Sequence, residues 1–295
     1  MIRRKKVNLL KINKLGSRHC GILVKPGGRA IFACLWLRKD TNSCRLYEEE
    51  QEQWRFSERK RSMKVAFDGF SPGALTFLGQ LKRHNRRPWF LKNKETYEQR
   101  VKTPMTQLVQ AINAELRHFA PEMVTEPKRA IYRIYRDIRF SPDKSPYKTH
   151  VAALFAPTAL AKHACAGYYF HFSPEELLVA GGVYMPGPKE LLAIRNHIAE
   201  NSKELRGIAA NGQFKKLFGG LEGDQLSRVP KGFASDHPAV DLLRYKQFLV
   251  AATHPPDLVL RKELLPTLVQ AFKAMTPLVR FLNAPLKPGK RELLL

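Results

Sequence analysis

The stretch GYYFHFSPEELLVAGGVY, residues 167–184, decides the fold class of this chain. Apolar residues dominate two short runs within it, 167–172 and 177–184, and only four residues separate them. Short runs rich in aromatic and β-branched residues are typical of strands, and a short connection favours antiparallel pairing. Residues 151–155 and 248–252 have the same character. The sequence therefore predicts a mainly antiparallel sheet.

Helical patterns precede and follow these strands. Helices are predicted over residues 71–83, 97–119, 188–208 and 257–282, with a short one that Asp236 caps. Ser71 and Pro72 form a helix start, because Pro at the first helical position loses no hydrogen bond. Pro104 is expected to kink or divide the second helix. This order of elements predicts an α+β fold, a single domain with a mainly antiparallel sheet packed by helices.

Residues 1–62 differ from the rest of the chain. They hold 16 basic and 6 acidic side chains without sustained periodicity, and a patterned sequence begins at Met63. Two interpretations remain open: a disordered basic extension, or a mis-assigned start that makes Met63 the natural one. Either leaves residues 63–295 as the single α+β domain.

The charge balance limits the classes of partner. The chain carries 51 Lys and Arg against 26 Asp and Glu, a formal net charge of +25. Such a surplus favours anionic partners, including nucleic acid and phosphorylated small molecules. The basic segment 1–62 supplies a disproportionate share of the charge, so nucleic-acid binding is possible but not favoured.

Targeting and redox signals are sparse. No apolar run approaches the ~20 residues of a membrane helix. The four cysteines contain no C-x-x-C pair, which argues against a zinc site and fits a reducing compartment. We expect a cytoplasmic protein without a membrane partner, cofactor or metal; the oligomeric state is open.

The run RIYRDIRFSPDKSPYKTH, residues 133–150, is the polar centre of the chain. Alternation over residues 128–140 predicts a strand, and two prolines stiffen the turn that follows. Basic and aromatic residues of this run, with one arginine further along, are the candidate ligand-binding residues: Arg133, Arg136, Arg139, Lys144, Tyr147, Lys148 and Arg244. Guanidinium and ammonium groups that converge in this way bind phosphate or carboxylate.

Two residues are candidate catalytic groups. Asp137, between arginines, is either part of a salt-bridge network or a general base. His237, in Asp236-His237-Pro238, is either a general acid or base or part of a helix entry turn. His171 alternates with apolar residues and reads as a sheet-face histidine, and the histidines show no metal-ligand spacing.

The string from Arg133 to Thr149 resembles the signature R-I-x-R-D-x-R-F-S-x-D-K-x-P-Y-K-T of the bacterial and fungal domain-of-unknown-function family 2461. Phe67-Asp68-Gly69-Phe70, Gly182-Val183-Tyr184 and Asp236-His237-Pro238 follow the family's pattern in its order. The resemblance covers roughly residues 67–282 and implies a single α+β domain. It implies no activity, cofactor or catalytic residue.

Three functions follow as hypotheses. The first is a positively charged pocket that binds a phosphate- or carboxylate-bearing ligand. The second is an enzyme that uses Asp137 or His237 as general base beside an arginine clamp. The third is sequence-independent nucleic-acid binding. Whether the protein is an enzyme stays open at this point.

Overall fold

The computed structural model describes residues 9–15, 18–24, 30–33, 66–160 and 164–286. The chain divides into two compact units, Met1–Met63 and Lys64–Leu295. Within the first, strands β1 (Leu9–Leu15), β2 (Arg18–Val24) and β3 (Ala30–Ala33) form an antiparallel sheet in that order. The other residues of this unit lie outside the described residues, and the two interpretations of residues 1–62 stay predictions.

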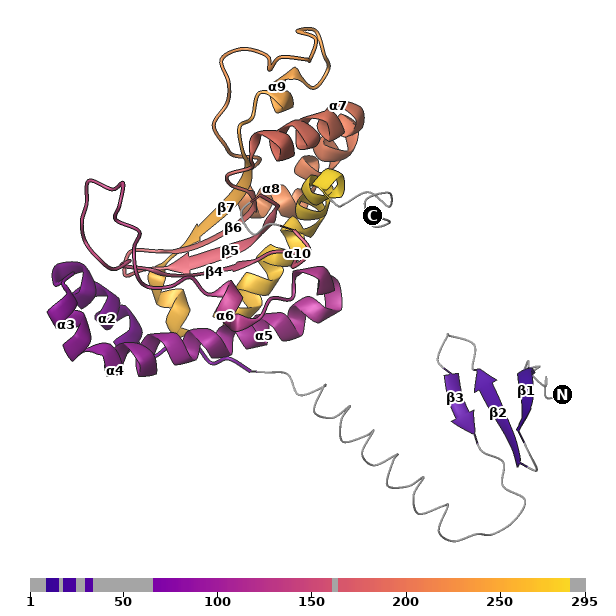
Figure 1. The fold of residues 1–295 in the computed structure, drawn as a ribbon, viewed down its shortest axis with the longest axis horizontal. Coiled ribbons are helices and arrows are strands. Elements are labelled where there is room, and N and C mark those ends of the chain that lie inside the picture. The colour runs from indigo at the N-terminus through magenta and orange to yellow at the C-terminus, as the bar shows by residue number, and fades with distance from the viewer. Residues whose placement is uncertain (1–8, 16–17, 25–29, 34–65, 161–163, 287–295) are drawn as a thin grey trace. The chain divides into compact units, whose positions relative to one another are not determined.

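A four-stranded antiparallel sheet organises the second unit (Figure 1). Its strands are adjacent in chain order: β4 (Val151–Phe155), β5 (Gly167–Phe172), β6 (Leu177–Val183) and β7 (Phe248–His254). All four strands were predicted, and the α+β fold is confirmed.

One face of this sheet is buried beneath helix α10 (Leu264–Asn283). Tyr168, Phe170 and Phe172 of β5 are buried on that face, whereas Tyr169 and His171 between them are half-buried on the other. Gly181 of β6 lets α10 approach closely, because a Cβ there would collide with the sulfur of Met275.

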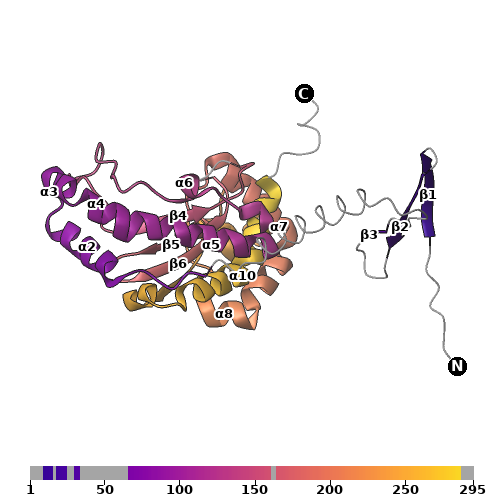
Figure 2. The same ribbon diagram turned by 90° about the horizontal axis from the view of Figure 1, so that it is seen from below.

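The first half of the unit supplies a series of helices, of which the last packs beside α10. They are α2 (Pro72–Arg83), α3 (Arg87–Lys92), α4 (Lys94–Tyr97), the π-helix Glu98–Lys102, and α5 (Thr103–Phe119). α5 and α10 lie side by side across the sheet (Figure 2). Pro104 has no N–H to donate to the carbonyl of Arg100, and the turn before it widens into the π-helix. A π-helical turn thus lies directly before Pro104, where a kink or a division of the helix was predicted.

The remaining elements complete the helical layer. They are the 3₁₀ turn Pro121–Met123, α6 (Pro127–Ala130), α7 (Pro188–Ala210), α8 (Gly212–Phe218), α9 (Val240–Leu243), and the 3₁₀ turns Pro256–Leu260 and Ala284–Leu286. Asp236 does not cap α9, whose N-cap is Ala239, so that part of the prediction was wrong. Among the described residues, no helix is long and apolar enough to cross a membrane.

The strand predicted over residues 128–140 is also wrong. Its first residues belong to helix α6, and Ile131 and Tyr135 then form only isolated bridges, to Ala153 and Tyr147. The alternation has a different cause: Ile134 points into the core while charged neighbours pair locally in the loop. The bridge to Ala153 lies on β4, at one edge of the sheet. A similar bridge, from Glu222 to Leu249, lies on β7 at the opposite edge.

Candidate functional site

The segment 131–150 folds back on itself as an irregular hairpin between α6 and β4, seen at the left of Figure 1. Arg136 N–H donates to the Pro146 carbonyl at 2.9 Å, and Lys148 N–H donates to the Ile134 carbonyl at 2.8 Å. These backbone bonds bring the two basic residues Arg136 and Lys148 to the base of the hairpin, although 11 residues separate them in sequence.

Tyr147 anchors the hairpin to the first helices. Its side chain is only 3% exposed and stacks on Phe90 of α3 with ring centroids 4.1 Å apart. Its backbone makes two hydrogen bonds with the side-chain amide of Asn85, which follows α2. The signature segment is therefore fixed to residues more than 50 positions earlier in the chain.

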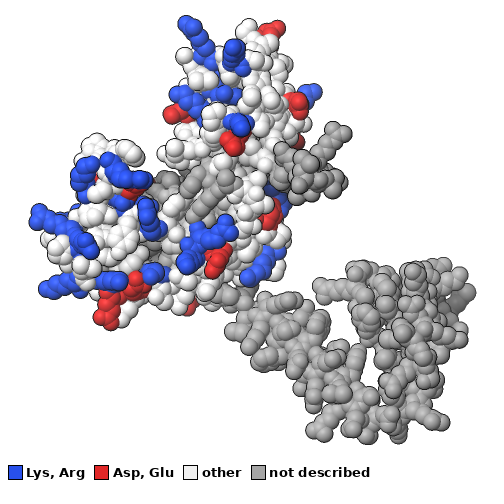
Figure 3. Space-filling view, in the orientation of Figure 1, with Lys and Arg blue, Asp and Glu red and all other residues white. Residues whose placement is uncertain are grey.

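A cavity of about 590 Å³ opens where these parts meet. It is lined by Lys82, Asn85, Arg136, Asp137, Asp143, Ser145, Tyr147, Lys148, Thr149 and His150. Every lining residue carries a polar or charged group, among them three cations and two carboxylates. Figure 3 shows Lys and Arg side chains gathered over the end of the domain that carries α2 and α3.

Arg136 is held by its neighbours in the hairpin. Its guanidinium pairs with Asp143 and donates to Ser141 Oγ at 3.3 Å. Hydrogen bonds from Ser145 and the Arg136 charge lower the pKa of Asp143, so this carboxylate stays ionised. The guanidinium is thus oriented at the cavity wall by an acid that offsets part of its charge.

Asp137 is paired in the same way, with Arg139. Arg139 Nε and Nη2 donate to its two carboxylate oxygens at 3.0 and 2.7 Å. These bonds lower the pKa of Asp137 to about 2. A carboxylate with so low a pKa is a weak base near neutral pH, because general bases work best with a pKa near the operating pH. The salt-bridge interpretation of Asp137 is the one this geometry favours.

Lys148 differs from the other cavity cations. Lys82 pairs with Glu175 at 2.6 Å, whereas Lys148 has no acidic partner among the described residues. Its ammonium lies over the Tyr132 ring, 5.0 Å from the centroid. Burial, and then the Arg133 charge, lower the pKa of Lys148. A half-buried ammonium without a carboxylate attracts an anion.

His150 ends the signature segment and was not among the sequence-predicted site residues. Its ring lies 5.1 Å from the ring of His171 on β5, centroid to centroid. Burial, together with His171, Lys148 and Arg136, lowers the pKa of His150 to about 4. The imidazole is therefore neutral at pH 7. Its position at the end of the basic run was the available signal.

His171 is fixed by partners on both ring nitrogens. Nδ1 shares a hydrogen bond of 3.1 Å with the Tyr169 hydroxyl, and Nε2 lies 3.3 Å from Glu176 Oε1. With Nε2–H donating to the carboxylate, Nδ1 accepts from the phenol. Both ring nitrogens of His171 are therefore engaged, and its ring packs against the ring of His150.

The other predicted residues do not line the cavity. Arg133 is exposed, and Lys144 donates to the Ile138 carbonyl at 3.1 Å. Arg244 Nε donates to the Leu226 carbonyl at 2.6 Å, and His237 Nδ1 accepts from Ala239 N–H at 3.0 Å. The last two belong to the α9 region, well separated from the hairpin in Figure 1. There, the Arg244 side chain holds a loop through Leu226, and the His237 ring holds a turn through Ala239.

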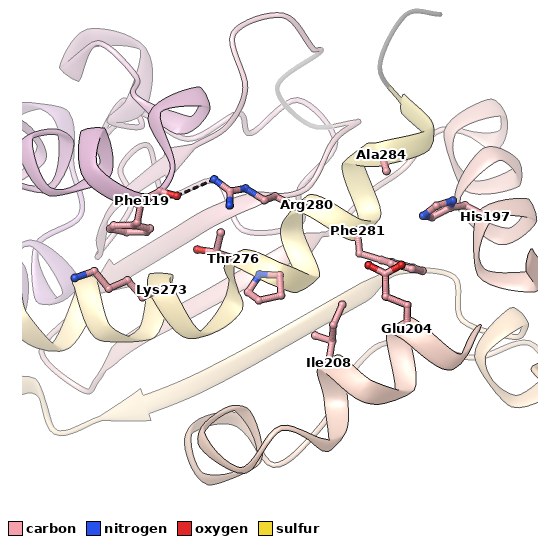
Figure 4. Close-up of a pocket in the computed structure, with 10 residues that line it drawn as sticks. Phe119, His197, Glu204, Ile208, Lys273, Thr276, Arg280, Phe281 and Ala284 are labelled. Atoms are coloured by element: carbon pink, nitrogen blue, oxygen red, sulfur yellow. Dashed lines mark hydrogen bonds between the residues drawn. The ribbon is translucent and has the colours of Figure 1, made fainter. Parts of the chain in front are cut away.

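A second cavity, of about 660 Å³, lies between α5, α7 and α10 (Figure 4). Arg280 is already engaged, because it donates to Glu122 and to the Phe119 carbonyl, both at 2.7 Å. Lys273 lies over the Phe119 ring, as Lys148 lies over the Tyr132 ring. Much of the remaining lining is apolar. This cavity is larger but offers less to an anion. Within the described residues, no group of three His, Cys, Asp or Glu side chains is placed to hold a metal ion.

Comparison with known proteins shows which family the chain belongs to. A family model described as Conserved hypothetical protein (DUF2461) matches residues 73–281, more than half of the chain. No curated protein and no solved structure matches it. The matched range contains the four-stranded sheet and every residue that lines the polar cavity. The resemblance inferred from the sequence is confirmed, and the chain belongs to the family Conserved hypothetical protein (DUF2461).

Proposed function

We propose that the polar cavity binds a small molecule that carries a phosphate or carboxylate group. Lys148 is the observation that supports this most directly. It is a half-buried cation on the cavity wall, and no described acid neutralises it. Partly buried charges in proteins are ordinarily paired, so an anionic ligand is the natural partner. The family carries no activity that would assign the ligand.

Arg136 and the Thr149 hydroxyl supply the rest of the anion site. Arg136 keeps donors beyond those spent on Asp143 and Ser141, because a guanidinium has five N–H groups. The Thr149 hydroxyl can donate to a further ligand oxygen. We place this function in the cytoplasm, where the free, buried thiol of Cys165 stays reduced.

Isothermal titration calorimetry with inorganic phosphate tests the proposal. Lys148→Met is expected to weaken phosphate binding about tenfold, since a charge-assisted hydrogen bond contributes roughly 1.5–3 kcal/mol. The matched control is Lys203→Met on α7, an exposed lysine outside the cavity. Its affinity should equal that of the unaltered protein. An equal loss in both variants would mean that overall charge alone attracts phosphate.

Nucleic-acid binding, the alternative function, would give a different pattern of salt dependence and of variant effects. Oligonucleotide affinity would fall steeply with salt, and single substitutions in the cavity would change it little. Phe140, 92% exposed beside Arg139, would then provide a stacking surface at the hairpin tip. A salt-sensitive loss of oligonucleotide binding in Phe140→Ala, with Lys148→Met unaffected, would favour that function over the cavity.

A further inference from the structure

The size and the lining of the polar cavity narrow the class of ligand further than the charge of the cavity does. Its volume of about 590 Å³ falls within the roughly 300–1,000 Å³ of small-molecule sites. A bare phosphate would leave most of it unfilled. The ligand therefore has a body as well as an anionic group, and the lining has to match that body.

Aromatic surface suited to a nucleobase is missing from the lining. Tyr147 is the one Phe, Tyr or Trp among the described lining residues, and its ring is buried against Phe90. Its face is thus unavailable for stacking. The other lining residues carry hydroxyl, amide, carboxylate, imidazole or cationic groups. Such a surface complements hydroxyl groups, which both donate and accept hydrogen bonds.

His150 provides the specific contact. Among the described residues, neither of its ring nitrogens has a hydrogen-bond partner, whereas both nitrogens of His171 are engaged. A neutral imidazole presents one donor and one acceptor. A phosphate oxygen that carries no proton cannot satisfy the acceptor nitrogen. A hydroxyl group next to the phosphate can.

We infer that the ligand is a hydroxylated organic phosphate, of the sugar-phosphate or polyol-phosphate class, with its phosphate on Lys148 and Arg136 and a hydroxyl on His150. This inference rests on the proposed anion site and narrows its ligand. It assigns His150 as a specificity-determining residue and leaves any reaction aside.

Calorimetry with four probes tests it: inorganic phosphate, glycerol 3-phosphate, ribose 5-phosphate and AMP. We expect at least one of the two hydroxylated phosphates to bind about tenfold tighter than inorganic phosphate, the effect of roughly one added hydrogen bond. In His150→Phe that preference should fall to about one, because the ligand hydroxyl loses its imidazole partner. His118→Phe on α5, an exposed histidine outside the cavity, should keep the preference.

The outcomes separate the two proposals. Equal affinities for all phosphates would overturn the ligand class and leave the anion site standing. Tightest binding of AMP, unaffected by His150→Phe, would replace the class with nucleotides. No binding of any probe would remove the anion site itself. His150→Asn, which keeps a donor and an acceptor, should retain part of the preference if the phenylalanine variant folds poorly.

Discussion

The side-chain amide of Asn85 pairs with the backbone of Tyr147 as a neighbouring strand would. Asn85 Nδ2 donates to the Tyr147 carbonyl at 2.9 Å, and Asn85 Oδ1 accepts from Tyr147 N–H at 3.1 Å. The pair joins the end of α2 to the hairpin and lies in the cavity wall. One asparagine thus fixes both the hairpin and one side of the candidate site.

Asn85→Ala should destabilise the domain by about 1–3 kcal/mol, because both Tyr147 backbone groups lose their partner in a part-buried place. Denaturant unfolding measures the change. Asn196→Ala, at an exposed position of α7, is the matched control and should be neutral or slightly stabilising. Equal effects would show that the amide contributes nothing specific. Phosphate affinity should also fall in Asn85→Ala, since the hairpin loses its anchor.

Gly181→Ala should destabilise the domain by about 1–3 kcal/mol, because the added methyl meets Met275 of α10 where the core is already filled. Gly207→Ala on α7 is the control. A Cβ there meets no neighbour, and the helix should gain about 0.5–1 kcal/mol. Combining Gly181→Ala with Met275→Ala should destabilise less than the sum of the single changes. Strict additivity would contradict the contact.

Asp137→Asn should leave the fold intact and raise phosphate affinity about two- to fivefold, because a negative charge leaves the wall and Arg139 is released. Glu200→Gln, exposed on α7, removes the same charge away from the cavity and should leave the affinity unchanged. A fall in affinity with Asp137→Asn would mean that the carboxylate contacts the ligand directly.

Acid should weaken the domain partly through His150, which faces His171, Lys148 and Arg136. Its folded pKa of about 4 lies below the ordinary histidine pKa of 6.5, so the unfolded chain binds the proton more readily. This contribution to stability is present above pH 6.5 and disappears as the pH falls towards 4. Unfolding at several pH values should show His150→Phe losing less stability over this window, by on the order of 1–2 kcal/mol. Parallel curves would contradict the depressed pKa.

Carbethoxylation tests the protonation state of the same imidazole independently, since diethyl pyrocarbonate reacts with the neutral form. His150 should react as fast at pH 6 as at pH 8, because its pKa of about 4 keeps it neutral at both. Peptide mass mapping follows the rate. Saturating phosphate should slow the modification, whereas modification of exposed His118 should not respond to phosphate. An unchanged His150 rate with phosphate bound would place the anion elsewhere.

The sheet was predictable because the apolar runs that form it are short, closely spaced and bounded by turns. Residues 151–155 and 167–172 coincide with observed strands. Residues 128–140 misled because Ile134 and the local Asp137–Arg139 pair imitate the alternation of a strand without strand pairing. Sequence alternation alone does not distinguish these two causes.

The candidate site was only partly predictable. Arg136, Tyr147 and Lys148 were named from their clustering in one segment, and the structure places them around one cavity. Lys82 and Asn85 could not be named, because nothing in the sequence indicates that α2 ends against the hairpin. Arg244 was grouped with them by charge alone and lies elsewhere, where it donates to the Leu226 carbonyl.

Two of the isolated bridges lie at the outer edges of the four-stranded sheet. β4 and β7 are the outer strands of an open sheet, and an outer strand offers unpaired N–H and C=O groups to other chains. Ile131 and Glu222 occupy part of those edges through their bridges to Ala153 and Leu249. The segment that leads into the cavity therefore also shields the β4 edge. A substitution that detaches it would expose a template for aggregation while the helical core remains folded.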